Sequence, residues 1–362
     1  MKITICVTYL TGGGAERVAS LWATGFAKRG HEVTIVLNTA QTTVSYSVPD
    51  FVRIQNVYKK ENRLLRELCF GTARRLRKIL KAEKPDVIIS VLPSWCRIVW
   101  LAKVGLNIPY IDTEHNAFER PQEAPMHWRE RLDKFVFSRL ANGMTVLTKA
   151  DYSIISSRRH NVFVLPNPIA FNPVKKVPMK ENIILACGRL DVWYTKGFDL
   201  LIRAWGSIAS NHIDWKLIIA GDGEKESYQF LNNLAEDCHL QKSQFELIGR
   251  CEDMQSLYKK SSIFILSSRF EGFGMVLTEA MSQGCACIAC DYKGRQSEII
   301  KEKDAGVIIP TESEDEISNV LSNLLKDKKK RESFQKRGLE RSNIYMLDNI
   351  MNRWDEILRE IL

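Results

Sequence analysis

The chain has 362 residues, of which 45% are hydrophobic, and it carries a formal net charge of +9. This length exceeds what one hydrophobic core usually serves, so we expect two domains. No internal repeat or low-complexity segment interrupts the sequence, and no run of 18 apolar residues predicts a membrane-spanning helix.

Segments typical of strands and of helices alternate along almost the whole chain, which predicts an α/β fold with two parallel sheets covered by helices. The sequence goes straight into the first strand without a signal peptide, and most of the nine cysteines lie singly in apolar runs, so we expect a cytoplasmic protein. The expected strands are residues 2–8, 32–37, 86–91, 109–112, 143–147, 162–165, 182–187, 216–220, 245–248, 262–266, 286–290 and 306–309.

A glycine-rich turn, Thr11–Arg17, follows the first strand and opens a helix expected over residues 15–28. Three consecutive glycines let a ligand approach the backbone without a Cβ in the way. The spacing is not GxGxxG, which disfavours a dinucleotide site. Taken alone, the stretch fits a tight strand-to-helix turn equally well.

Residues 59–84 contain ten Lys or Arg and three Glu, and so carry most of the net positive charge of the chain. Leucine and isoleucine recur at helical spacing within this basic segment, with a break considered at Gly71. A basic amphipathic helix suits an anionic membrane surface. The alternative is a solvated outer face whose leucines pack on the first sheet. Nucleic acid is disfavoured because no known reader motif accompanies the charge.

Four prolines between residues 166 and 178 break both helix and sheet, which places a linker near residues 168–179. The expected domains are residues 1–168 and 169–345. A last helical segment follows them, within residues 346–362.

Two cations flank the start of the second domain's first helix. Arg189 follows the expected strand over residues 182–187, and Lys196 precedes a helix that starts at residue 198. At the carboxyl end of a parallel sheet this pair suits a diphosphate, although ordinary surface cations are the alternative. The turns that follow residues 216–220 and 245–248 are expected to line the same crevice.

Glu271 and Glu279 enclose a glycine turn between a buried strand and a helix. The unpaired amides and the dipole of that helix N-terminus favour phosphate. The two carboxylates are suited to accept hydrogen bonds from sugar and ribose hydroxyls, so the combination indicates a nucleotide sugar. A solvated loop residue and an exposed helix residue are the alternative.

A Cys-x2-Cys pair, Cys287 and Cys290, lies in a strand of small buried residues, without a second pair or a spaced histidine. This context favours buried structural cysteines over a zinc site.

In combination, the Gly-Gly-Ala-Glu-Arg, Gly-Arg-Leu…Lys-Gly-Phe, Gly-Asp-Gly and Glu-x7-Glu motifs resemble the retaining glycosyltransferases of the GT4 type across essentially the whole chain. The chain is most similar to bacterial enzymes that build lipopolysaccharide O-antigen, capsule or lipid-linked glycans. The resemblance implies the GT-B fold, with two Rossmann-like domains whose parallel sheets face each other across a cleft. The first domain would bind the acceptor and the second the nucleotide sugar, and the last helix would cross back onto the first.

The resemblance further implies transfer of a hexose or N-acetylhexosamine from a nucleotide sugar to a lipid-linked saccharide. UDP is the favoured nucleotide, and the expected site of action is the inner face of the cytoplasmic membrane. No cofactor is implied. No metal is expected either, since no Asp-x-Asp motif is evident and two cations already cover the diphosphate.

The roles implied for single residues group around the donor. Arg189 and Lys196 would stabilise the leaving diphosphate, Glu271 would bind the transferred sugar, and His115 would lie beside that sugar. The residues expected to bind the nucleotide are Gly13, Gly14, Gly249, Arg250, Gly274, Met275, Val276 and Glu279.

Three alternatives stay open. An epimerase of the same fold would turn over the donor without an acceptor, and a phosphorylase would need a lysine environment for pyridoxal phosphate. A non-catalytic nucleotide-binding protein at the membrane is the third, and the complete set of Arg189, Lys196, Glu271 and Glu279 argues against it.

Overall fold

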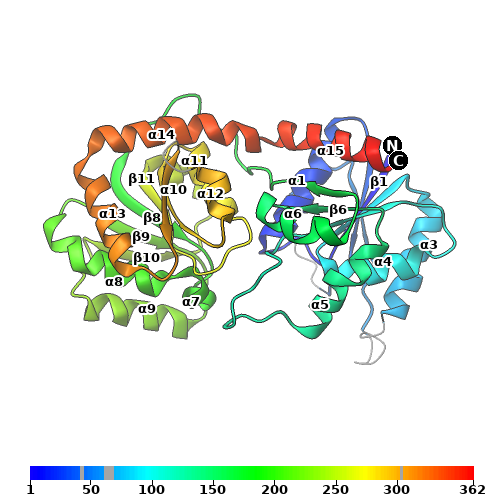
Figure 1. Ribbon diagram of the computed structural model, residues 1–362, viewed down its shortest axis with the longest axis horizontal. Helices are drawn as coiled ribbons and strands as arrows, with labels where there is room; N and C mark the ends of the chain where they lie inside the picture. Colours follow the sequence, from blue (N-terminus) through cyan, green and yellow to red (C-terminus); the bar gives the residue numbers. More distant parts are fainter. Residues whose placement is uncertain (41–44, 61–68, 302–304) are drawn as a thin grey trace. The chain divides into compact units, whose positions relative to one another are not determined.

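The computed structural model describes residues 1–40, 45–60, 69–301 and 305–362. The chain forms two compact units, one of Met1–Ala170 with Leu347–Leu362 and the other of Phe171–Met346. Both termini therefore belong to the first unit (Figure 1). The acceptor and donor roles of the two units remain predictions.

The first unit is built on a seven-stranded sheet with the order β3-β2-β1-β4-β5-β6-β7, in which every neighbouring pair is parallel. Its central strands are buried on both faces because helices cover them, which explains their continuous apolar runs. The strands are β1 Lys2–Val7, β2 Glu32–Leu37, β3 Arg53–Asn56, β4 Val87–Val91, β5 Tyr110–Thr113, β6 Gly143–Val146 and β7 Val162–Val164.

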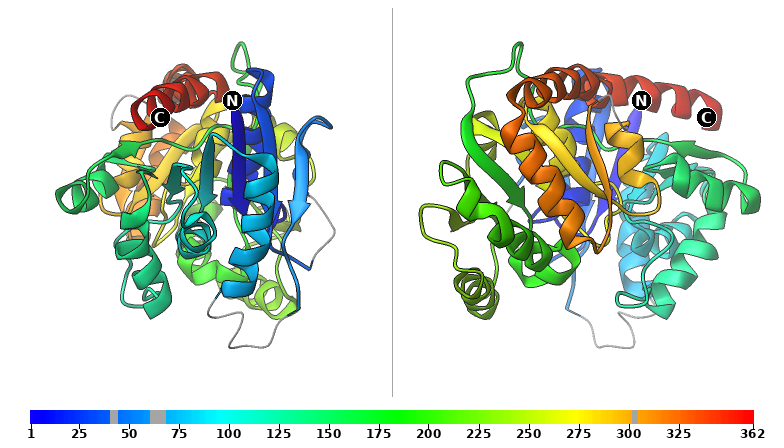
Figure 2. Two further views of the ribbon diagram at one scale, coloured as in Figure 1. Left: turned by 90° about the vertical axis from the view of Figure 1, so that its right-hand side faces the viewer. Right: turned by 60° about the vertical axis from the view of Figure 1, so that its left-hand side comes forward.

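Helices from both ends of the chain cover this sheet. The last helix, α15, packs on α1, and Trp354 meets Trp22 edge to face at 5.0 Å between ring centroids. Figure 2 shows the two helices from further sides. The helices are α1 Gly14–Lys28, α3 Phe70–Glu83, α4 Cys96–Lys103, α5 Trp128–Phe135, α6 Lys149–Ile155 and α15 Leu347–Ile361, with short 3-10 turns η1 Pro93–Trp95, η2 Phe137–Leu140 and η3 Ser156–Arg158.

The second unit has a six-stranded parallel sheet with the order β10-β9-β8-β11-β12-β13. The chain reverses its direction of winding between β8 and β11, and it does so between β1 and β4 in the first unit. Ligands bind such open sheets at the carboxyl ends of the two strands that flank this switch. The strands are β8 Glu181–Cys187, β9 Lys216–Ala220, β10 Phe245–Gly249, β11 Ser261–Leu266, β12 Ala286–Asp291 and β13 Gly306–Pro310.

Helices α8, α9 and α13 contribute apolar side chains to the main core of this unit, and α11 packs against α14 (Figure 1). All nine cysteines are free thiols, and Cys285, Cys287 and Cys290 are buried at or in β12. The helices are α7 Trp193–Lys196, α8 Phe198–Ile208, α9 Lys225–Asp237, α10 Met254–Lys260, α11 Met275–Ser282, α12 Arg295–Ile300, α13 Glu314–Lys326 and α14 Lys328–Ser342, with η4 Leu190–Val192, η5 Ala209–Asn211 and η6 Asn343–Tyr345.

The predicted α/β class with two parallel sheets is confirmed. One detail is wrong. The sequence does not predict β3, an edge strand whose residues are mostly exposed and which therefore lacks an apolar run. Helix α3 begins at Phe70, so a break of the basic segment near Gly71 stays a prediction. Residues 61–68 of the basic segment lie outside the described residues, and within those described no helix is long and apolar enough to cross a bilayer.

Candidate functional site

The residues expected to contact the diphosphate and the transferred sugar follow the two strands that flank the switch point of the second sheet. Arg189 comes two residues after β8 and is exposed, and Lys196 ends the short helix α7. Glu271 lies in the turn between β11 and α11. The fold thus brings these three predicted residues to the carboxyl edge of one sheet.

Lys196 and Glu271 form an ion pair, with 2.7 Å between Nζ and Oε2. About a fifth of each side chain is exposed, so the pair is accessible to a ligand. Ser268 also donates a hydrogen bond to Oε2 of Glu271, at 3.3 Å. Each member of the pair therefore holds the other in place, and a phosphate and a sugar hydroxyl are natural replacements for the two partners.

Arg269, which the sequence analysis does not single out, fixes the positions of both residues. Its guanidinium donates two hydrogen bonds to the Asp199 carboxylate, at 2.6 and 2.8 Å, and a third to the carbonyl of Tyr194. The guanidinium also lies 4.0 Å from the centre of the Tyr194 ring. Because Tyr194 and Asp199 flank Lys196, this clamp ties α7 and α8 to the loop that carries Glu271.

Gly197 allows this close approach. Its φ is +65°, and a Cβ at this position would lie 2.0 Å from the carbonyl oxygen of Ser267. The Ser267 hydroxyl donates to the carbonyl of Lys196 at 2.8 Å, and the amide of Arg269 donates to the carbonyl of Thr195 at 2.9 Å. The Lys-Gly sequence therefore permits two loops to hydrogen-bond along their backbones.

The N-terminus of α11 offers amides to an anion. Gly274 precedes the helix with φ +89°, which lets the chain turn sharply after β11. No side chain of the described residues caps α11, and its first turn contains no acidic residue. The first amides, at Met275 and Val276, thus suit the predicted phosphate contact.

Glu279 lies one helical turn further into α11 and is only 3% exposed. The buried phenol of Tyr258 donates a hydrogen bond to its Oε2 at 3.3 Å, and the Cys187 thiol lies 3.2 Å from the same phenol. Tyr258 thereby connects Glu279 with the end of β8. The sequence holds no local signal for this contact, because Tyr258 belongs to the apolar face of a short helix.

Three loops lie in a row at this edge of the second sheet. The amide of Leu190 donates to the carbonyl of Asp222, and the amide of Gly221 donates to the carbonyl of Gly249, both at 2.8 Å. Gly249 has φ +68°, and the exposed Arg250 follows it. The loops that follow β8, β9 and β10 are therefore neighbours at this edge, and that they line one crevice stays a prediction.

The glycine turn in the first unit differs from the N-terminus of α11 because an acidic side chain lies beside it. The side chain of Glu16 is buried in the first turn of α1, and a Cβ placed on Gly13 would lie 1.8 Å from its Oε2. A phosphate beside Gly13 and Gly14 would meet this carboxylate, whereas a hydroxyl group would meet no such repulsion. The turn is thus better suited to a neutral part of a ligand.

His115 follows β5 and is held on both sides of its ring. Its Nε2 is 3.1 Å from the Thr113 hydroxyl, its Nδ1 is 3.2 Å from the Asn167 amide oxygen, and the Trp22 ring lies 5.4 Å away between centroids. Burial lowers the pKa of His115 to about 4, and the hydrogen bond to Asn167 opposes this shift. The imidazole is therefore neutral at pH 7 and acts as a hydrogen-bonding group rather than a cation.

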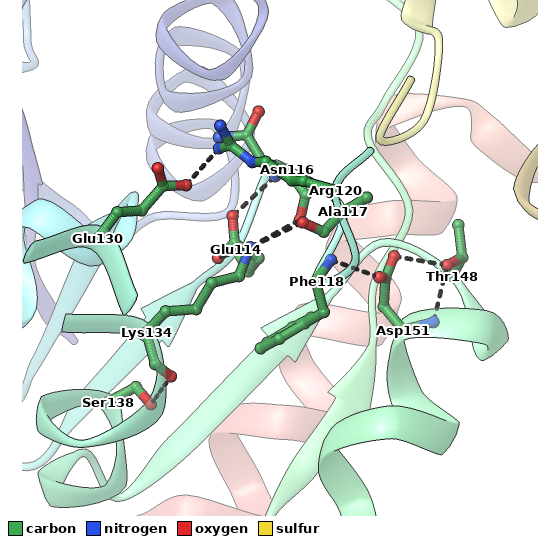
Figure 3. A network of polar contacts seen from close by, with 10 residues as sticks. All are labelled: Glu114, Asn116, Ala117, Phe118, Arg120, Glu130, Lys134, Ser138, Thr148 and Asp151. Carbon is green, nitrogen blue, oxygen red and sulfur yellow. Dashed lines mark hydrogen bonds and ion pairs between the residues drawn. The ribbon is translucent and has the colours of Figure 1, made fainter. Parts of the chain in front are cut away.

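A buried ion pair orders the chain next to His115, and Figure 3 shows this pair, Glu114 and Lys134, with its hydrogen-bond partners. Lys134 of α5 is fully buried, and its Nζ lies 2.9 Å from Oε2 of Glu114. The same ammonium donates to the carbonyl of Ala117 at 2.9 Å, and Glu114 accepts from the amide of Asn116 at 2.7 Å. The residues on both sides of His115 are thus fixed by groups that face no solvent.

Among the residues that the structure describes, no group of three His, Cys, Asp or Glu side chains is arranged to hold a metal ion. The cations of the candidate site are protein side chains, Arg189 and Lys196. The need for a metal in the reaction stays a matter for prediction.

Two family profiles match the chain in succession. A profile described as "Glycosyltransferase Family 4" matches residues 12–171, and one described as "Glycosyl transferases group 1" matches residues 170–341. The chain is 27% identical over 351 residues to a Haemophilus influenzae protein described as an uncharacterized glycosyltransferase, with 96% of this chain and 97% of the relative covered.

A Campylobacter jejuni relative is 26% identical, with 100% of this chain and 99% of the relative covered. It is described as an α-1,4-N-acetyl-D-galactosaminyltransferase that acts on GalNAc-α-(1→4)-GalNAc-α-(1→3)-diNAcBac-PP-undecaprenol. Among solved structures, the S. aureus protein TarM, crystallised as a variant with fondaparinux, α-GlcNAc-glycerol and UDP, shares the fold. Its TM-score is 0.82 at 15% identity, and the match covers 98% of this chain and 99% of TarM.

Proposed function

The chain belongs to glycosyltransferase family 4, and we propose that it transfers a hexose or N-acetylhexosamine from a UDP-sugar to a lipid-linked saccharide, with retention at the anomeric carbon. The relative that acts on an undecaprenol-linked saccharide supports this class of acceptor, and the UDP bound to TarM supports the nucleotide. The identity of the sugar follows from hydroxyl contacts in the pocket and is left to experiment.

One observation carries the proposal: the ion pair of Lys196 and Glu271 lies beside the uncapped N-terminus of α11. A cation and free amides suit a diphosphate, and the adjacent carboxylate suits the hydroxyls of a sugar. A nucleotide sugar presents both groups next to each other, because its transferred sugar is attached directly to the diphosphate.

In the proposed reaction, the bond between the anomeric carbon and the diphosphate oxygen breaks, and its electron pair stays on the diphosphate. Arg189 and Lys196 stabilise the charge that develops there, aided by the amides of Met275 and Val276. The acceptor hydroxyl attacks from the same face, and its proton passes to the leaving phosphate oxygen. No protein nucleophile is needed for this step.

The remaining donor contacts follow from the chemistry of each residue. We assign the ribose hydroxyls to Glu279, a hydroxyl of the transferred sugar to Glu271, and the base to the backbone at Gly249 and Arg250. In the first unit, the neutral imidazole of His115 would contact a hydroxyl of the donor sugar. The glycine turn at Gly13 would approach a neutral part of the donor, because Glu16 lies beside it.

Membrane contact through the basic segment is a further part of the proposal. Within α3, Leu76 and Leu80 are buried in the first unit's core, so these leucines do not face a membrane. Arg74 and Lys78 are exposed on the same helix, and Phe70 at its start is 57% exposed. We therefore assign the contact to these cations and Phe70 rather than to the leucines.

The test is a transfer assay with purified protein, a panel of UDP-hexoses and UDP-N-acetylhexosamines, and diphospho-undecaprenol-linked saccharides. We expect an α-linked product from a UDP-α-sugar, as determined by NMR, and no product from the Lys196→Ala variant. Turnover of the donor without any acceptor would instead favour an epimerase. A product of inverted configuration would contradict the proposal.

A further inference from the structure

A large cavity lies at the edge of the second sheet opposite to the donor residues. Its volume is about 1070 Å³, and it lies between residues 172–180 and helix α14. Asn182 and Ser262, at the starts of β8 and β11, line it, whereas the donor residues follow the ends of the same strands. Figures 1 and 2 show the loop before β8 in green beside α14. The cavity is therefore separate from the proposed donor site.

The loop that forms one wall of this cavity is fixed to the body of the unit. The amide of Val174 donates to the carbonyl of Ser282 at 2.9 Å, and the Gln283 side chain donates to the carbonyl of Asn172 at 3.1 Å. At its other end, Lys180 donates to the carbonyl of Gln283 at 2.8 Å. Hydrogen bonds thus hold this loop against the rest of the unit at both of its ends.

The cations that line the cavity are of two kinds. Lys180 and Arg331 are turned inward and donate to backbone carbonyls, Arg331 to those of Leu324 and Leu325. Lys175 and Lys176 on the loop, and Lys336 on α14, are exposed.

Within the described part of the chain, those three exposed lysines take part in no ion pair or side-chain hydrogen bond. They line the cavity from two walls, Lys175 and Lys176 from the loop and Lys336 from α14. Their charges are therefore available to an anion. Helix α14 contains seven Lys or Arg and two Glu, and both glutamates, Glu332 and Glu340, also line the cavity. Glu332 pairs with Lys328, and the cations of the lining still outnumber its two carboxylates.

Apolar side chains share the lining with these lysines. Met179 lies at the rim and is 95% exposed, and α14 contributes Leu339. The others are Val174, Val177, Pro178 and Met346. A single exposed Met is ordinary on a protein surface, but here it adjoins an apolar lining between two cationic walls. The cavity thus matches a ligand with an anionic head and an apolar body.

We propose that this cavity binds an anionic phospholipid of a membrane surface, with the phosphate between Lys175, Lys176 and Lys336 and the upper part of an acyl chain against Val177, Met179 and Leu339. A free phosphate would use the lysines alone, and a neutral apolar ligand would leave them unpaired. This contact belongs to the second unit and is independent of the proposed transfer reaction and of the basic segment in the first unit.

The test uses the full chain and co-sedimentation with vesicles of phosphatidylcholine alone or mixed with phosphatidylglycerol. We expect binding only to the mixed vesicles. A Lys175→Ala/Lys176→Ala variant should bind about thirtyfold more weakly, because each lysine near an anionic surface contributes about fivefold. The matched control is Lys225→Ala/Lys242→Ala, which removes the same charge from exposed positions elsewhere in the unit.

Further variants separate the sources of binding. Met179→Ser should weaken binding about tenfold, since it removes an inserted apolar side chain. Equal losses in the cavity pair and in the control pair would overturn the proposal, as would an effect confined to an Arg74→Ala/Lys78→Ala variant of α3. An unchanged affinity of Met179→Ser, or full competition by inorganic phosphate at constant ionic strength, would show an anion site without a lipid and overturn it as well.

Discussion

Arg269 shows how one buried side chain can determine the geometry of a site that it does not enter. Only 9% of its side chain and 7% of that of Asp199 are exposed, whereas their further partners, Glu312 for Arg269 and Arg203 for Asp199, are largely exposed. Breaking such a pair costs more than the pair itself contributes, because the remaining charge stays buried without its main partner. Lys196 and Glu271 both lie within a few residues of this clamp.

We therefore expect Arg269→Gln to lower the free energy of unfolding by about 3–5 kcal/mol. Arg269→Lys should lower the free energy of unfolding by a smaller amount, since an ammonium keeps the charge but cannot make the bidentate contact with the carboxylate. Arg203 is the matched control: it also pairs with Asp199, at 3.6 Å, but 43% of its side chain is exposed. Arg203→Gln should cost less than about 1 kcal/mol in urea unfolding. Similar small losses for both arginines would contradict the clamp.

His115 gives the stability of the protein a defined dependence on pH. Its pKa is lowered to about 4 by burial, below the value of about 6.5 in an unfolded chain. The unfolded state therefore binds this proton first, and stability falls as the pH drops through the window between 6.5 and 4. Between pH 7.5 and pH 5 the loss from this residue should be about 2 kcal/mol.

The comparison that isolates this effect is urea unfolding of the wild type and of His115→Gln at both pH values. The variant should lack the loss of about 2 kcal/mol, while the contributions of the other buried groups remain. If both proteins lose the same stability on acidification, His115 is not held neutral by its surroundings.

At the scale of single residues, the sequence predicts the candidate site residues after the strand ends but not the residues that hold these side chains in position. Arg189 and Glu271 are predicted because a strand precedes each of them, and Lys196 because a helix follows it; their roles in binding stay predictions. The pair of Arg269 and Asp199 joins positions 70 residues apart, and no local pattern marks it. The contact of Tyr258 with Glu279 is invisible for the same reason.

At the scale of elements, the junction of α7 and α8 depends on a glycine. Gly197 has a left-handed φ and packs on the carbonyl of Ser267, so any larger residue would push the loop of Lys196 away from that of Glu271. Gly30 has a comparable φ of +81°, but no atom lies within 4 Å of its missing Cβ. Substitutions at the two glycines therefore distinguish the cost of backbone strain alone, at Gly30, from the cost of strain plus a clash, at Gly197.

We expect Gly30→Ala to cost about 1–2 kcal/mol, the price of a left-handed residue with a Cβ. Gly197→Ala should cost more than about 3 kcal/mol, because the clash with Ser267 adds to the same strain. Thermal or urea unfolding of the two variants measures the difference. Equal costs would show that the loops do not need their close approach.

The elements that the sequence predicts best are those buried on both faces. The central strands of both sheets are continuous apolar runs and are recognised within one or two residues of their ends. The edge strand β3 is missed because Arg53, Ile54 and Asn56 are exposed and leave no apolar pattern. The basic segment is ambiguous in the sequence because the leucines of α3 serve the core while its outer cations remain solvated.

At the scale of the whole molecule, the chain returns at its end to the unit in which it began. Trp354 of α15 is fully buried against Trp22 and Phe26 of α1, and Arg29, directly after α1, pairs with Asp355. The last helix therefore belongs to the first unit's core, although the second unit separates the two in sequence.

Trp354→Ala should consequently destabilise the protein by about 3–5 kcal/mol, as expected for the loss of a large buried aromatic side chain. Glu356 lies on the exposed side of the same helix, and Glu356→Ala should change stability by less than about 0.5 kcal/mol. Chemical unfolding followed by fluorescence and by circular dichroism compares the two. A small effect of Trp354→Ala would mean that α15 is not part of the core.

The central claim is that the switch point of the second sheet binds the diphosphate of a UDP-sugar. Its most direct test is thermal stabilisation of the purified protein by UDP, GDP, ADP and NAD, beside an Arg189→Ala/Lys196→Ala variant shown to be folded. We predict that UDP alone stabilises the wild type, by about 2.7 kcal/mol at about 100 times its dissociation constant, and that the variant does not respond. No response of the folded wild type to UDP, or an equal response in the variant, would contradict the claim.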